Sequence, residues 1–115
     1  MSQETSTLTP DSYGQVYVVS YFKPLAGKKD IIIAGMKELA AAVEENEPRT
    51  QVYEVFWDEE EGVVVVMPKY ADVATAEAHK NSTHLQEAMK RSTEAVVLAA
   101  PPQTKVLTKL ASFVR

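Results

Sequence analysis

The sequence predicts a single α+β domain of the ferredoxin-like type, in which two βαβ units share one four-stranded antiparallel sheet. Three observations lead to this fold class. The chain has 115 residues, which is enough for one hydrophobic core and too short for two. Its apolar patterns follow the order strand, helix, strand, strand, helix, strand, which is the order of the split βαβ fold. One strand contains four consecutive valines, which indicates a strand that is buried on both faces.

The domain begins after a polar segment. Residues 1–13 are rich in Ser, Thr and acidic side chains, so we expect a flexible tail there and one domain over residues 14–115. Residues 16–22, VYVVSYF, are almost all β-branched or aromatic, and Gly14 and Pro24 bound them. This pattern predicts the first strand.

The next segment has the spacing of an amphipathic helix. Apolar side chains recur at intervals of three and four residues, at Ile32, Met36, Leu39 and Val43. We expect this helix to end near Asn46, because a proline follows two residues later and cannot continue it.

A hairpin of two antiparallel strands is predicted next. Residues 50–57 and the GVVVVM segment are typical of strands, and the acidic run before Gly62 is typical of a solvated turn. Side chains alternate between the two faces of a strand, so the valines at positions 63–66 place apolar groups on both faces. Something must therefore cover each face of this strand.

The last part of the chain predicts two helical segments and a strand. Asp72 is a suitable N-cap for a short alanine-rich helix. A second helix is expected from about Ser82 to Ala99, because Pro101 follows and stops it. Residues 104–114, TKVLTKLASFV, predict the closing strand.

Both helices of a split βαβ fold cover the same face of the sheet, which leaves the opposite face bare in a monomer. The valine run predicts that this bare face is apolar, and an exposed apolar face of that size marks an interaction surface. A second copy packed sheet against sheet is the simplest partner. We therefore expect a homodimer built as a dimeric α+β barrel.

Composition excludes several function classes. Twelve Lys and Arg against 16 Asp and Glu give a net charge of -4, and no basic run stands out, so nucleic acid is not an expected partner. The chain has no cysteine, which excludes disulfides, thiol nucleophiles and thiolate metal sites. No basic and apolar leader and no membrane-length apolar run is present, so we expect a cytoplasmic protein without a membrane partner.

Three local patterns stand in a defined order along the chain: FKPLAGKKD at 22–30, ENEPRTQVYEV at 45–55 and KYADVATAEAHKNSTH at 69–84. Together they resemble the antibiotic biosynthesis monooxygenase family, which has a Glu-Pro-Gly-Thr turn and an aromatic, Asp, Ala and His-x-x-Ser arrangement. The resemblance covers residues 16–89, with a looser match of the closing ASFVR segment to the family's last strand. It implies the same dimeric α+β barrel.

The chain departs from the family pattern at two places. Proteins of the family often have Glu-x-Trp at the end of the third strand, where this chain has Pro68, Lys69 and Tyr70, so a carboxylate is missing. Arg49 stands where the turn usually has Gly. Similar proteins oxidise anthrone-type polyketides without a cofactor, open haem, or isomerise small phosphorylated signals, so the resemblance fixes the fold better than the reaction.

The resemblance implies first a cofactor-independent monooxygenase that oxidises an aromatic, polyketide-like secondary metabolite with O₂. The deprotonated substrate supplies the electrons in such a reaction, so the protein must offer an apolar aromatic pocket and one base. His79 is the best-placed titratable group and Tyr70 lies nine residues before it, so we expect these two to be catalytic. The side chains expected to bind substrate are Tyr17, Tyr21, Tyr53, Trp57 and Asn81. No cofactor and no metal is expected.

Other interpretations stay open. A non-oxidative isomerase or cyclase and a small-molecule-binding stress-response barrel fit the same scaffold, and a haem-opening enzyme has weaker support from His79 and Asn81. His79 can equally be a structural imidazole, and Glu47 is expected to be a turn or helix-end residue rather than a catalytic acid. His84 lies five residues from His79, a spacing that does not place both on one helix face, so no zinc site is expected.

Overall fold

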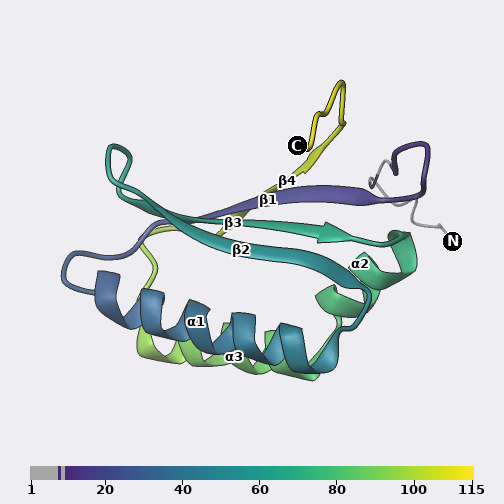
Figure 1. Cartoon of the computed structure of the whole chain (residues 1–115). Coiled ribbons are helices and arrows are strands. Elements are labelled where there is room, and N and C mark those ends of the chain that lie inside the picture. The colour runs from purple at the N-terminus through teal and green to yellow at the C-terminus, as the bar shows by residue number, and fades with distance from the viewer. Residues whose placement is uncertain (1–7, 9) are drawn as a thin grey trace, which may run out of the picture.

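The chain forms a four-stranded antiparallel sheet with helices α1, α2 and α3 packed on one face (Figure 1). The computed structural model describes residue 8 and residues 10–115. Along the chain the elements are β1 Val16–Phe22, α1 Lys29–Asn46, β2 Thr50–Asp58, β3 Val63–Tyr70, α2 Val73–Lys80, α3 Thr83–Ala95 and β4 Gln103–Leu107. The strand order is β2-β3-β1-β4, with β3 between the two strands that α1 connects. The predicted ferredoxin-like split βαβ fold is confirmed.

The valine run lies in β3 and contributes to both faces of the sheet. Val64 and Val66 are buried in a core cluster with Ile32 of α1, on the helix-covered face. Val63 and Val65 point to the other face, where they are only partly covered. The strand was expected to be buried on both faces; the helix-covered face is buried in the single chain, and cover for the other face stays a prediction.

The face of the sheet opposite the helices, which we call the open face, is largely apolar. Strand register and side-chain alternation place on it Tyr17, Val19, Tyr21, Val52, Phe56, Val63, Val65, Met67 and Leu107, together with the polar Glu54, Asp58, Lys69, Gln103 and Lys105. Phe56 is 47% exposed and Met67 is 40% exposed. A hollow of about 200 Å³ on this face is lined partly by Tyr17, Met67 and Leu107.

The helices form a single layer below the sheet in Figure 1, with α1 and α3 side by side and α2 at one end. Leu39 and Val43 of α1 are buried, in agreement with the predicted apolar stripe. α3 has partly buried side chains and none that is fully buried. Within residues 10–115, none of these helices combines the length and the apolar character that a bilayer crossing needs.

Two expectations for the last third of the chain are wrong. The helix expected to reach Ala99 ends at Ala95, because Val96 turns into a left-handed conformation and Val97 packs into the core. The strand expected over residues 104–114 ends at Leu107, which pairs with Tyr17 near the start of β1. Because β1 begins at Val16, almost none of its backbone remains to pair with residues 108–115.

The segment before β1 includes a tight turn at Asp11. Its carboxylate accepts hydrogen bonds from the backbone amides of Tyr13 and Gln15, at 2.9 Å each, and from the Tyr17 hydroxyl at 3.1 Å. The flexible tail expected over residues 1–13 falls mainly on residues 1–7 and 9, which lie outside the described residues. That expectation stays a prediction.

Candidate active site

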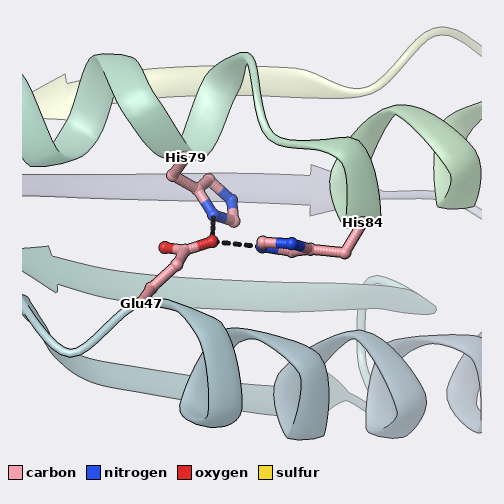
Figure 2. Close-up of side chains that lie close together, drawn as sticks. All are labelled: Glu47, His79 and His84. Atoms are coloured by element: carbon pink, nitrogen blue, oxygen red, sulfur yellow. Dashed lines mark hydrogen bonds and ion pairs between the residues drawn. The ribbon is translucent and has the colours of Figure 1, made fainter.

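Three titratable side chains converge at one end of the helical layer. Glu47 is the C-cap of α1, His79 lies in the last turn of α2, and His84 lies in the first turn of α3. The Nδ1 atom of His79 is 2.7 Å from Oε2 of Glu47, and Nε2 of His84 contacts the same oxygen. Figure 2 shows both imidazoles directed at this single carboxylate oxygen. We call Glu47, His79 and His84 the triad.

A break between two helices brings the two histidines together. α2 ends at Lys80, and Ser82 caps α3 by accepting a hydrogen bond from the Leu85 amide. Ser82 also donates its hydroxyl to the carbonyl of His79 at 2.8 Å, which fixes the chain direction between the helices. The spacing argument against a shared site holds only within one continuous helix, so it does not apply here.

Glu47 is held as an ionised carboxylate. Burial alone would raise its pKa, but hydrogen bonds from Thr50, His79 and His84 outweigh burial and bring the pKa below its ordinary value. The Thr50 hydroxyl donates to Oε1 at 2.7 Å, which leaves Oε2 to the two imidazoles. A carboxylate only accepts hydrogen bonds, so each ring nitrogen that faces it carries the hydrogen.

This arrangement fixes the tautomer of His79. With its hydrogen on Nδ1, the neutral ring keeps a free lone pair on Nε2. The rings of Tyr53 and Tyr70 flank the imidazole, with centroids 5.5 Å and 5.6 Å away. Burial, followed by nearby negative charge, raises the pKa of both tyrosines, so their hydroxyls stay protonated near neutral pH. Within this cluster the imidazole is therefore the group suited to accept a proton.

A comparison with protein families finds one family that matches most of this chain. The profile of the family described as "Antibiotic biosynthesis monooxygenase" matches residues 15–91, about two thirds of the chain and all elements from β1 to most of α3. The chain belongs to this family. The matched range contains the whole triad and both flanking tyrosines. A search of curated proteins finds no significant match.

Solved structures support the family fold of this antibiotic biosynthesis monooxygenase homologue. A candidate antibiotic biosynthesis monooxygenase from Caulobacter crescentus CB15 is 26% identical with a TM-score of 0.75, covering 86% of this chain and 92% of its own. Rv0793 from Mycobacterium tuberculosis is 19% identical with a TM-score of 0.75, covering 85% of this chain and 97% of its own. A further candidate family member, from Bacteroides thetaiotaomicron VPI-5482, is 16% identical with a TM-score of 0.75, over 89% and 95% of the two chains.

In this family member the structure brings Tyr53 and Tyr70 to His79, and it places the other expected substrate-binding residues elsewhere. Tyr17 and Tyr21 lie on the open face, where Lys109 and Lys105 stand over their rings at 4.5 Å and 5.6 Å from the centroids. The sheet separates these two rings from the triad. Their assignment as substrate ligands stays a prediction.

The contacts found for Trp57 and Asn81 are with groups outside the triad. Trp57 is near the end of β2, with the Lys29 ammonium 4.3 Å from its ring centroid, at the opposite end of α1 from Glu47. Asn81 caps α2 and donates its side-chain amide to the Glu77 carbonyl at 3.0 Å. Asn81 thus stabilises the helix end, and the assignment of Trp57 and Asn81 as substrate-binding residues stays a prediction.

The sequence predicted correctly that Glu47 lies at a helix end, but it did not predict that Glu47 contacts both histidines. It also gave no reason to place His84 in the site. The useful signal was Ser82, a favourable N-cap that ends one helix and starts the next between the two histidines. The side chains of Glu47 and His79 are 9% and 10% exposed, whereas His84 is 19% exposed. A ligand therefore meets the triad most directly from the His84 side.

Proposed function

We propose that this protein is a cofactor-independent monooxygenase that oxidises an electron-rich aromatic compound of the anthrone or hydroquinone type with O₂. Membership of a family that includes monooxygenases supports an oxidation. The observation that carries the proposal is the buried dyad of Glu47 and His79, in which Nδ1 of His79 faces the carboxylate and the imidazole packs against the rings of Tyr53 and Tyr70. This is the combination of one base and an aromatic surface that the reaction requires.

The proposed chemistry depends on the orientation of the His79 ring, in which Nδ1 faces Glu47 and Nε2 accepts the proton. An anthrone gives a proton of its CH₂ group to Nε2 of His79, and the Glu47 carboxylate stabilises the resulting imidazolium. The substrate carbanion passes one electron to O₂, and the two radicals join as a peroxide. Loss of the second C–H proton and cleavage of the O–O bond leave a ketone and water. Overall R₂CH₂ and O₂ give R₂C=O and H₂O, so no external reductant is needed.

Tyr53 and Tyr70 bind rather than titrate in this proposal. Because their hydroxyls keep their hydrogens, they offer ring faces and hydrogen-bond donors to a phenolic or quinonoid oxygen. Such donors stabilise negative charge that develops on the substrate when it loses its proton. An anthrone or hydroquinone anion is therefore a suitable ligand.

We also propose that the working form is a homodimer in which the open faces of two copies pack together. The apolar composition of that face and the partial exposure of Phe56 and Met67 support this arrangement. The triad lies on the opposite side of the sheet, so each copy would carry its own site.

Oxygen uptake with an anthrone or hydroquinone, with chelator present and no added flavin or metal, tests the oxidation. His79→Ala should lower kcat by about 10²-fold or more, the usual contribution of general-base catalysis, while the circular dichroism spectrum stays unchanged. Tyr13→Phe is a control, because Tyr13 is 86% exposed in the turn before β1.

Tyr70→Phe separates the two contributions of Tyr70, because it keeps the ring and removes the donor. A fall in kcat with an unchanged KM would show that the hydroxyl stabilises the transition state. Unchanged turnover in His79→Ala would leave His79 with a structural role only. Absence of oxygen uptake by the wild-type protein with both substrate classes would overturn the oxidation.

A further inference from the structure

We propose that the triad is also a binding site for a divalent transition-metal ion such as Zn²⁺, and that the bound ion inhibits the oxidation. The second part rests on the proposed function. The donor set is two imidazole nitrogens and one carboxylate oxygen, whose ligand atoms all lie within 4.8 Å of one another. Nitrogen-rich sets of this kind favour late first-row ions over Mg²⁺ and Ca²⁺, which prefer oxygen ligands.

The distance between His79 and Glu47 fits a shared ion after a small adjustment. Bonds of about 2.0 to 2.2 Å to zinc place two ligand atoms of a tetrahedral site about 3.4 Å apart. His79 Nδ1 and Glu47 Oε2 are 2.7 Å apart, so the carboxylate needs to withdraw by less than about 1 Å. The three ligands come from three separate elements, so the adjustment requires the Glu47 carboxylate to shift against its hydrogen bond from Thr50.

The surroundings of the triad resemble the supporting shell of a metal site. The Thr50 hydroxyl binds the second oxygen of Glu47 at 2.7 Å and orients the carboxylate. The rings of Tyr53 and Tyr70 pack against the His79 imidazole and limit its rotation. The side chains of the triad are 9% to 19% exposed, so the ligands are largely shielded, and His84 offers the more open approach. Three protein ligands leave a fourth position for water or another small ligand.

An ion at this position removes the proton acceptor. Zn²⁺ would bind the lone pair of His79 Nδ1, the atom that now faces Glu47, so the neutral ring would keep its hydrogen on Nε2. The same ion would also occupy the carboxylate that stabilises the imidazolium. Binding of Zn²⁺ and proton acceptance at Nε2 are thus mutually exclusive.

Equilibrium dialysis with elemental analysis tests binding directly, using ZnCl₂ and the full chain. We expect one Zn²⁺ per chain, and affinity at least 10-fold weaker in both His84→Ala and Glu47→Gln. Glu45→Gln is the matched control, because Glu45 is an exposed carboxylate two residues from Glu47 in the last turn of α1. It should bind as the wild type does. Circular dichroism of each variant separates loss of a ligand from loss of the fold.

Oxygen uptake by the same samples then tests inhibition. Zn²⁺ should abolish the uptake over the concentration range in which it binds, and a chelator should restore it. Equal Zn²⁺ binding by the wild type and both triad variants would overturn the site, whatever the protein oxidises. Binding at the triad that stimulates oxidation would overturn the inhibition. The wild type could bind one Zn²⁺ per chain, and the variants none, while no sample takes up oxygen. That result would support the metal site and contradict the proposed function.

Discussion

At the scale of single residues, Arg49 and Asp72 form a link between the start of β2 and the start of α2. The guanidinium of Arg49 donates to the Asp72 carboxylate at 2.8 Å, and Asp72 also caps α2 by accepting from the Thr75 amide at 2.7 Å. The resemblance to the family makes Arg49 a departure, since a glycine is usual at that position. Here the longer side chain pairs with the helix cap.

The Asp72 interactions predict a loss of stability in acid. Hydrogen bonds from Thr75 and Arg49 lower the pKa of Asp72 to about 2, from an ordinary value of 3.8. A carboxyl group whose folded-state pKa is depressed stabilises the fold above its unfolded-state pKa, and this contribution disappears as the pH falls from about 4 toward about 2. Asp72→Asn keeps a capping oxygen and removes the charge.

Urea unfolding of the wild type and Asp72→Asn between pH 2 and pH 7 measures this effect. The wild type should have the higher midpoint at pH 7, and the two midpoints should converge near pH 2. Asp30→Asn, which removes a carboxylate from the first turn of α1, controls for net charge. A constant difference between wild type and Asp72→Asn across the whole range would contradict the assignment.

The triad marks the limit of prediction at the residue scale. His79 stands out in the sequence because imidazole is suited to proton transfer near neutral pH. Glu47 lies 32 positions away along the chain, and only the docking of α1 against the α2–α3 turn brings it into contact. Local patterns predict helix ends and caps well, but they contain no distances between separate elements.

At the scale of elements, the end of α3 contains an unusual backbone conformation. Val96 has φ of 52° and ψ of 64°, which is the left-handed region, and its side chain is 63% exposed. A β-branched residue is unfavourable there, and glycine is the usual choice. The conformation is maintained because the Val97 amide bonds to the Ser92 carbonyl and Val97 then enters the core.

Val96→Gly should therefore stabilise the protein. Relief of the left-handed strain should outweigh the greater freedom of glycine in the unfolded chain, for a net gain of about 0.5 to 1 kcal/mol in the free energy of unfolding. Val96→Ala keeps a Cβ atom and should gain less. Urea denaturation of the three proteins provides the measurement, and a Val96→Gly variant less stable than the wild type would mean that the Val96 side chain contributes packing.

The same region shows why the end of the last helix was predicted wrongly. Val96 and Ala99 continue the apolar spacing of α3, so periodicity alone extends the helix to the prolines. Two tertiary interactions end it earlier: Val97 is buried, and the Ala99 amide donates to the Lys23 carbonyl at 2.8 Å. By contrast, β1, α1 and the β2–β3 hairpin were predictable because periodicity, prolines and turn residues agree there.

At the scale of the whole molecule, the open face is the surface through which we propose that two copies associate. A dimer that buries this face should bury more than about 1,200 Å² in total, as specific interfaces do. We expect light scattering to give twice the chain mass of 12.7 kDa at micromolar concentration. A stable species of one chain mass would contradict the dimeric barrel.

A pair of methionine variants tests which face forms the interface. Met67→Glu places a charge on the open face, where Met67 is 40% exposed, and should give monomers that keep the native circular dichroism spectrum. Met89→Glu makes the same substitution on α3, where Met89 is 51% exposed, and should leave the dimer intact. The reverse outcome would place the interface on the helical layer.

The position of Trp57 has a consequence for spectroscopy. It is the single tryptophan of the chain, and it packs beside Lys29 at the start of α1, while Glu47 follows the other end of this 18-residue helix. The two ends lie about 27 Å apart at the rise of 1.5 Å per residue. Tryptophan emission, excited selectively over tyrosine, therefore reports on the surroundings of Trp57 at the start of α1 rather than on local events at the triad. A change in tryptophan emission during a zinc titration would signal a structural change that extends beyond the triad to the start of α1.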